Sequence, residues 1–264
     1  MWVTKPACGL FNLDVCKSSS TTSLLVTLLL GMFLLVGTLI VFLTDNDKKL
    51  VNFSIGLALS VMVMLAIGDL IPEAYELIKA SYNLTDTIII IVVSILIGIV
   101  ILKILDLYIP DHDSDNKEQL LHIGIVSAVA LVLHNIIEGM ALYGVLMTSV
   151  KLGVLVCIGI GLHNIPLGLT ITSTLFKANN NKKKTILTVL CVSLSTFVGG
   201  LLMFLFGNTI NDFLLGVLLA ITLGMILYIA LFELLPHVRE NKNKYTVFGI
   251  LLGLILMIIS TFIH

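Results

Sequence analysis

The chain has 264 residues, of which 58% are hydrophobic and only 12% are charged, and its mean hydropathy is +1.12. A soluble domain carries about 25% charged residues, so this chain has too few charges to cover a surface that faces water. The composition therefore excludes a soluble enzyme and a disordered regulator. The net charge of -1 offers no basic patch for nucleic acid, and the expected environment is the lipid bilayer.

Eight stretches of the chain are long and apolar enough to cross a membrane as helices, which takes roughly 20 mostly apolar residues. They lie at residues 24–43, 51–78, 87–108, 120–148, 152–176, 185–208, 213–235 and 245–263. Short polar segments separate them, and the alternating polarity typical of barrel strands is absent from the sequence. We therefore expect an all-α integral membrane protein with eight transmembrane helices, formed as one domain over residues 1–264.

Lysine and arginine are distributed unevenly between the two ends of these stretches. The first, third, fifth and seventh loops hold ten of them, whereas the polar leader at residues 1–23 and the even loops hold four. Because positive charge favours the cytoplasmic side, the odd loops are expected in the cytoplasm, and the leader and both termini outside the cell. Cys8 and Cys16 then face an oxidising side, where a disulfide and two free thiols both stay open. The Ile, Asn and Lys content fits a bacterial coding sequence, hence a bacterial plasma membrane.

Two similar motifs lie near the middle of the fourth and fifth stretches, HNIIEG at 134–139 and HNIPLG at 163–168. These stretches are sequence neighbours joined by a tight turn, so their helices are antiparallel and their midpoints meet at one depth. His134 and Glu138 lie four residues apart and share a helix face. Imidazole and carboxylate suit divalent transition metals. A single membrane histidine is more often a hydrogen-bonding group between helices, but two matched His-Asn pairs favour a metal site.

Other ionisable residues inside the stretches extend this pattern toward both sides of the membrane. Asp69 is expected in the outer half of the second span, and Glu233 toward the cytoplasmic end of the seventh. Further candidates are Glu73, Glu76, Lys103, Asp106 and His237. Such residues are expensive in lipid and usually face a cavity. Pro72, Pro166 and Pro236 each lie within three residues of one of these groups, and each frees a backbone carbonyl four residues earlier. A series of ligands from side to side favours a pathway. Asp111, His112, Asp113 and Asp115 in the third loop are better explained as solvated polar residues than as a metal-collecting site.

The motifs HNIIEG and HNIPLG, with GDLIPEAYEL before them and LYIALFELLPH after them, resemble the ZIP (ZRT/IRT-like protein) family of zinc and iron transporters, in its prokaryotic GufA-like branch. The resemblance covers all eight spans. It implies external termini and movement of divalent metal toward the cytoplasm through a site on the fourth and fifth helices. The metal ligands that it implies are His134, Asn135, Glu138, His163 and Asn164, with Asp69 at the external entrance and Glu233, together with His237, at the internal exit.

Two positions depart from the pattern of that family. Many relatives have a glutamate where this chain has Leu167, and some GufA-like members have a Glu-Pro pair near Thr196. In the family, the carboxylates at both positions hold the second ion of a two-metal site. We therefore expect one metal position at the membrane midplane, built mainly by His134, Glu138 and His163.

The expected function is transport of divalent transition-metal cations, zinc first and iron, manganese or cadmium as further substrates, by alternating access. Zn²⁺ is expected as the transported substrate, without an organic cofactor. The alternative is an intramembrane metal-dependent hydrolase, but the usual HExxH motif is absent because both histidines precede asparagine. A non-metal carrier, a metal sensor, a gated channel and proton coupling stay open. Small residues such as Gly199, Gly200, Gly249 and Gly253 fit either internal packing or a homodimer face.

Overall fold

The computed structural model of the protein describes residues 13–44, 48–108, 116–148, 150–207 and 210–263, and every regular element within them is helical. Six rods are single helices: α1 (Leu13–Leu43), α4 (Leu84–Tyr108), α5 (Asn116–Thr148), α6 (Val150–Asn179), α7 (Lys182–Phe206) and α10 (Lys244–Ile263). Two rods are composite: α2 (Lys48–Leu65), η1 (Ala66–Leu70) and α3 (Ile71–Lys79), and then α8 (Asp212–Tyr228), η2 (Ile229–Leu234) and α9 (Leu235–Glu240). The all-α architecture with eight helical rods is confirmed.

Seven of these rods are long and apolar enough to cross a membrane, and in α10 the part with described side chains is a shorter apolar stretch, Lys244–Ile259. The largest difference from the expected spans is at α1, which begins at Leu13 rather than at residue 24. Its early turns are polar, but Ser20 and Ser23 direct their hydroxyls at Met147 Sδ, at 3.9 and 3.7 Å. At Ser20 and Ser23, packing against the end of α5 thus supports helix in a segment that hydropathy alone assigns to a leader.

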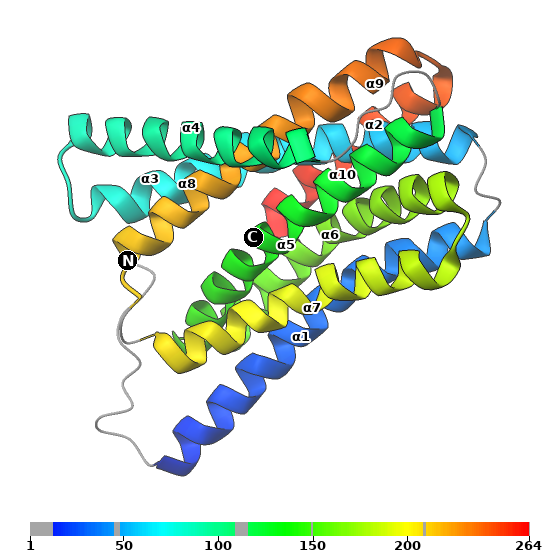
Figure 1. The fold of residues 1–264 in the computed structure, drawn as a ribbon. Coiled ribbons are helices and arrows are strands. Elements are labelled where there is room, and N and C mark those ends of the chain that lie inside the picture. The colour runs from blue at the N-terminus through cyan, green and yellow to red at the C-terminus, as the bar shows by residue number, and fades with distance from the viewer. Residues whose placement is uncertain (1–12, 45–47, 109–115, 149, 208–209, 264) are drawn as a thin grey trace.

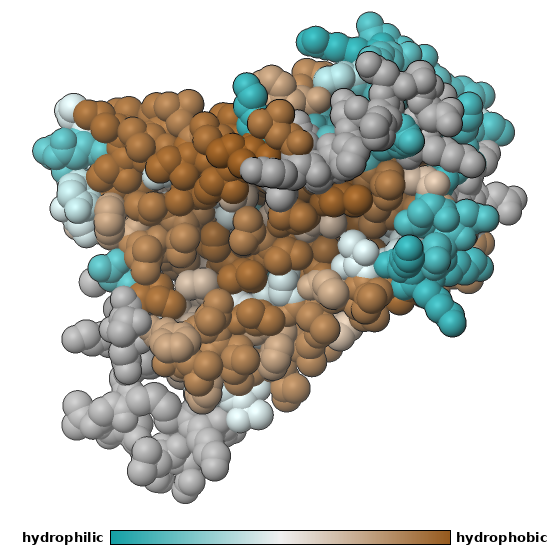
Figure 2. Space-filling view, in the orientation of Figure 1, coloured by the Kyte–Doolittle hydropathy of each residue, from teal (hydrophilic) through white to brown (hydrophobic). Residues whose placement is uncertain are grey.

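The outer surface of the rods is suited to lipid. Figure 2 shows a broad hydrophobic band, with hydrophilic residues gathered toward its two ends and most extensively near α9. On α4 the exposed side chains include Ile89, Val93, Ile97, Val100 and Ile104. Exposed aliphatic side chains of this kind cost nothing in hydrocarbon, so the exposed face of α4 fits a membrane-facing position.

The rods form two groups. α1, α5, α6 and α7 pack on one another, and the composite rods pack with α4 and α10 in a second group. Figure 1 shows α1 and α7 along one side of the molecule and α4, with α3 and α8 beside it, along the other. α5 and α6 lie between these sides, where α5 contacts α8 and α6 contacts α2 and α10. The motif-bearing helices therefore lie at the junction of the two groups.

Reciprocal glycines allow four helix pairs to meet backbone to backbone. The pairs are Gly56 with Gly249 in α2–α10, Gly98 with Gly224 in α4–α8, Gly139 with Gly199 in α5–α7, and Gly37 with Gly168 in α1–α6. A Cβ at any of these positions would overlap a carbonyl oxygen of the neighbouring helix. Gly200 and Gly253 likewise face Thr27 and Ser60 of this same chain. These small residues thus serve packing inside the chain rather than a homodimer face.

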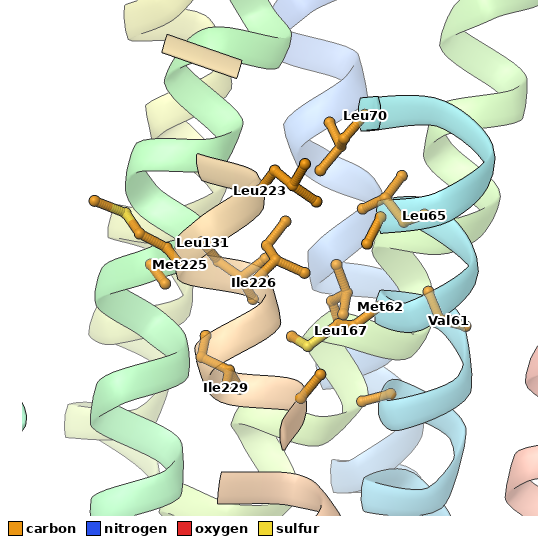
Figure 3. Close-up of a cluster of buried hydrophobic side chains, with 14 of the residues drawn as sticks. Val61, Met62, Leu65, Leu70, Leu131, Leu167, Leu223, Met225, Ile226 and Ile229 are labelled. Carbon is orange, nitrogen blue, oxygen red and sulfur yellow. The ribbon is translucent and has the colours of Figure 1, made fainter. Parts of the chain in front are cut away.

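A buried apolar cluster fills the space between the two groups. Figure 3 shows Met62 of α2, Leu167 of α6 and Ile226 of α8 pointing toward one another, with Leu131 of α5 beside them. All four are 3% exposed or less. Along α5 and α8 this cluster lies between the two cavities that are described below.

Candidate metal site

Three ionisable side chains meet where the two His-Asn motifs lie side by side. Glu138 Oε1 on α5 lies 3.1 Å from His163 Nε2 on α6 and 3.5 Å from His134 Nε2, one turn earlier on α5. All three side chains are buried, and their ligand atoms lie within 4.8 Å of one another. Within the described part of the chain, this is the one group of three or more His, Cys, Asp or Glu side chains whose ligand atoms lie this close together.

The glycine that ends each motif explains how these side chains come to face one another. Gly139 lies against the backbone of α7, and Gly168 lies against the backbone of α1. Each histidine precedes its glycine by five residues, which corresponds to a rotation of roughly 140° around the helix. Seating the glycine edge of each helix on its outer neighbour therefore turns both histidines away from that neighbour and toward the α5–α6 interface.

The spacing of the donor atoms fits a small divalent cation. Zinc binds imidazole nitrogen and carboxylate oxygen at about 2.0–2.2 Å in tetrahedral geometry, which separates neighbouring donors by about 3.4 Å. The two separations from Glu138 Oε1 to the histidine nitrogens, 3.1 and 3.5 Å, lie on either side of this value. Among the described residues, His134 Nε2 has the 3.5 Å contact with Glu138 but no hydrogen bond, which is uncommon for a buried polar atom. A metal ion between the three groups would satisfy it.

The two asparagines of the motifs differ in what they contact. Asn164 Nδ2 lies 3.4 Å from Glu138 Oε2, so this side chain borders the site. Asn135 Nδ2 instead donates to the Val192 carbonyl of α7 at 3.0 Å. Both Oδ1 atoms are buried, and neither has a hydrogen-bond partner in the part of the chain that the structure describes. Asn164 thus lies next to Glu138, whereas the amide nitrogen of Asn135 points to α7.

A cavity of about 660 Å³ leads from the group of His134, Glu138 and His163 to one end of the helices. His134, Glu138 and His163 line its inner part, and its lining extends to Lys79 at the end of α3 and to Asp212 at the start of α8. Asp69 and Glu73 line it between these points, together with Glu76. Asp69 therefore lies in the cavity that leads to His134, Glu138 and His163, although it does not belong to that group.

Glu233 lies on η2, away from the group of His134, Glu138 and His163. Its Oε1 is 3.6 Å from His122 Nε2 near the start of α5. The two side chains line a second cavity of about 340 Å³, with Gln119 and Tyr228. Sequence reasoning did not select His122, whose one signal is that it lies two residues inside the apolar stretch at 120–148.

Asp69 and Glu233 share a local backbone feature. Each lies in a π-helical segment, η1 or η2, and each is followed three residues later by a proline, Pro72 or Pro236. Proline lacks the amide that an α-helix needs, and π-helical turns take up such interruptions, often at functional positions. Pro166, in contrast, lies inside α6.

The remaining candidates whose side chains the structure describes line neither cavity. His237 is buried, and its Nε2 lies 3.4 Å from Asn52 Oδ1. Lys103 is exposed on α4, and the side chain of Asp106 lies outside the described residues, as do the third-loop positions 109–115 and Cys8. Leu167 belongs to the apolar cluster, and Thr196 is buried beside Gly139. At these two positions, where relatives have glutamate, the chain therefore offers no carboxylate ligand.

Comparison with known proteins finds the same family in a family model and in individual relatives. A family model described as ZIP Zinc transporter matches residues 109–261. The zinc transporter ZupT of Clostridium perfringens is 27% identical, and the match covers 89% of this chain and 93% of the relative. The proteins of the same name from Chlorobium chlorochromatii and Streptococcus mutans are 28% and 24% identical, over 89% and 90% of this chain and 94% and 96% of theirs.

Proposed function

We propose that this chain, which belongs to the ZIP zinc transporter family, carries divalent transition-metal ions, zinc foremost, across the cell membrane and into the cytoplasm. The observation that carries the proposal is the group of His134, Glu138 and His163 at the inner end of a cavity within the spanning helices. Iron, manganese and cadmium are further substrates, because they accept the same nitrogen and oxygen ligands. The bacterial relatives named zinc transporter support zinc and a bacterial plasma membrane.

The composition of the site suits an ion that must be bound and then released. A transport site has to replace the water around the ion without holding the ion too tightly. The Glu138 carboxylate neutralises part of the charge of the ion, and the two imidazoles supply neutral nitrogen donors. Asn164, 3.4 Å from Glu138, completes the surroundings with another neutral group. Thiolate ligands would bind zinc far more tightly, and Cys157 on α6 does not belong to the ligand group. One ion at a time occupies this midplane site.

The route that we propose begins at the outer end of the larger cavity. The lysine-rich loops lie at the opposite end of the antiparallel rods, so the positive-inside rule supports an extracellular position for the helix ends at Lys79 and Asp212. Both chain termini are then external. Asp69 acts at the entrance, where its carboxylate attracts the cation, and Glu233 acts at the exit.

The apolar cluster closes the route on the inner side. Along α5, Leu131 lies between His134 in the larger cavity and His122 in the smaller one; along α8 and η2, Ile226 lies between Leu219 and Glu233 in the same way. Met62 and Leu167 fill the space between these helices (Figure 3). A hydrated cation does not cross such a barrier, so release requires the cluster to open.

Alternating access supplies that opening. The close glycine contacts join helices within each of the two groups, whereas the junction between the groups is formed largely by side chains. Displacement of α1, α5, α6 and α7 as a unit against the other rods would part Leu131 and Leu167 from Met62 and Ile226. Movement of whole helix bundles around a midplane site is a common solution in carriers. The hydrolase alternative is not supported, because the family consists of transporters.

Zinc uptake into proteoliposomes that contain a zinc-sensitive dye tests the proposal. The wild type is expected to fill the vesicles with zinc, and Glu138→Ala and His163→Ala are expected to lose nearly all uptake. Glu240→Ala is a suitable control because Glu240 is exposed at the end of α9, away from both cavities. Circular dichroism and size-exclusion profiles show whether each variant is folded.

Two outcomes would contradict the proposal. If the folded Glu138→Ala and His163→Ala proteins still take up zinc at the wild-type rate, the midplane group is not the transport site. If the wild type moves none of zinc, iron, manganese or cadmium, the chain is not a metal carrier, and the metal-sensor explanation takes its place.

A further inference from the structure

A second histidine–carboxylate pair lies on the other side of the apolar cluster. His122 Nε2 on α5 and Glu233 Oε1 on η2 are 3.6 Å apart, and their side chains are 9% and 11% exposed. They face a cavity of about 340 Å³ whose lining also includes Gln119 and Ile123 of α5 and Tyr228 of α8. Two ionisable side chains therefore share a small, partly open space within the spanning helices.

The positions of these residues supply three donor groups for one ion. Gln119 and His122 are three residues apart on α5, so they lie on the same helix face one turn from each other. Glu233 comes from the π-helical segment that precedes Pro236, and it approaches from the opposite side of the cavity. An imidazole nitrogen, a carboxylate oxygen and an amide oxygen form a donor set of the same class as the midplane site.

We propose that His122 and Glu233, assisted by Gln119, form a second binding site for the transported metal, which receives the ion after it leaves the midplane. The resemblance stated earlier implies a role at the exit for Glu233 alone, and the structure adds His122 as its partner ligand. The proposal rests on the proposed transport function. With two charged or imidazole donors instead of three, this site binds the ion more weakly than the midplane group does.

The distance between the two sites fits successive occupation. His122 and His134 are twelve residues apart on one helix, which corresponds to about 18 Å along its axis. The side chains of Val126, Ala130 and Leu131 between them are buried and apolar. An ion released when this barrier opens would meet His122 and Glu233 before it reaches the cytoplasm, so the pair favours release in that direction and slows return.

The first test measures binding of Co²⁺ and Zn²⁺ to the purified full-length protein in detergent, by calorimetry and by the visible absorption of cobalt. In a His134→Ala/Glu138→Gln background, which removes the midplane site, one weaker ion is expected to remain. Adding His122→Ala is expected to weaken this binding at least tenfold, in the range found when a metal site loses a supporting group. The matched control is Leu121→Ala, at a partly buried position that lines neither cavity.

A ligand exchange separates a metal ligand from an ion pair that only holds α5 against η2. Thiolate prefers soft ions, so His122→Cys is expected to restore binding in that background and to shift it at least tenfold toward cadmium over zinc. His122→Phe, which fills the same space, is expected to restore neither. Equal metal preference in the His122→Cys and His122→Phe proteins would overturn the proposal and leave a structural pair.

Uptake assays distinguish failure of this proposal from failure of the transport function. In an otherwise wild-type chain, His122→Ala is expected to lower the maximal rate of zinc uptake severalfold while the zinc concentration at half-maximal rate stays unchanged, because capture still occurs at the midplane. Unchanged uptake in His122→Ala together with active wild type would overturn the inner site and leave the transport proposal standing. Absence of uptake by the wild type itself would contradict the transport proposal.

Discussion

His163 Nε2 and Glu138 Oε1 lie 3.1 Å apart across the α5–α6 interface, although 25 residues separate them in the sequence. Glu138 also reaches His134 on its own helix, so one carboxylate joins both histidines. This carboxylate is buried among the helices. A divalent ion at this position would neutralise the carboxylate and connect the two helices.

Zinc is therefore expected to stabilise the folded protein against heat. A ligand that binds only the folded state, present at one hundred times its dissociation constant, adds about 2.7 kcal/mol. Thermal unfolding in detergent with and without zinc measures the gain as a rise in Tm. Glu138→Gln should remove most of the rise, and magnesium, which prefers oxygen ligands in octahedral geometry, should produce little. An equal rise in Glu138→Gln would show that zinc stabilises the protein from elsewhere.

The two motif asparagines are expected to give different phenotypes. Asn164→Ala removes a side chain next to Glu138 and should weaken zinc binding by roughly 10-fold to 100-fold, as supporting groups of metal sites do. Asn135→Ala instead leaves the Val192 carbonyl without its donor and should cost about 1 kcal/mol of stability with a smaller change in affinity. Calorimetry and thermal unfolding of both variants test this. The reverse pattern would show that Asn135 is the ligand.

The sequence was sufficient to predict the eight rods, because the lipid requirement for about 20 apolar residues makes each span visible. It was also sufficient for the convergence of His134, Glu138 and His163, because consecutive antiparallel helices with matched midpoints must bring these positions together. The direction of Asn135 could not be read from the motif alone. Adjacent residues on a helix point roughly 100° apart, and only the position of α7 shows which way the amide turns.

The pairing of His122 with Glu233 was not predictable from the sequence. The two residues are 111 positions apart, and contact between them depends on how α5 packs against η2. The π-helical turns at η1 and η2 also change the helical register, so a count of residues from the proline does not give the face on which the carboxylate lies. The helical turns of α1 before the predicted span at 24–43 were not predicted for a similar reason, since Ser23 has a tertiary contact with Met147.

Leu167→Glu is expected to change the number of ions at the midplane. Leu167 lies four residues after His163 on α6, hence on the same face one turn away, and it is 1% exposed in the apolar cluster. An unpaired carboxylate there is costly, so without metal the variant should have a lower Tm than the wild type. Equilibrium dialysis against zinc should then find one more tightly bound ion per chain than in wild type. No additional ion would show that this position does not face the site.

The contact between α5 and α7 should tolerate no side chain at Gly139. A Cβ there would overlap the Thr196 carbonyl oxygen, whereas a Cβ at Gly144 on the same helix would meet only Met203 Cε, at 3.9 Å. Gly139→Ala is expected to cost about 1–3 kcal/mol, as overpacked cores do, and Gly144→Ala should be close to neutral. Thermal unfolding of the two variants compares them directly. Similar Tm values would mean that α5 and α7 do not meet at this glycine.

Thiol labelling examines the open and closed sides of the larger cavity. Ala141 lines that cavity, whereas Ala130 is 0% exposed near the apolar cluster. In a chain whose four native cysteines are replaced, a membrane-impermeant thiol reagent added outside the cell should modify Ala141→Cys and leave Ala130→Cys unmodified.

Zinc should slow the reaction of Ala141→Cys, because this position lies about one turn from Glu138 and an ion at the site hinders the reagent. Modification of Ala141→Cys only from the cytoplasmic side would reverse the proposed orientation of the helices. Equal modification of both cysteines from outside would mean that the cluster of Met62, Leu131, Leu167 and Ile226 does not close the route.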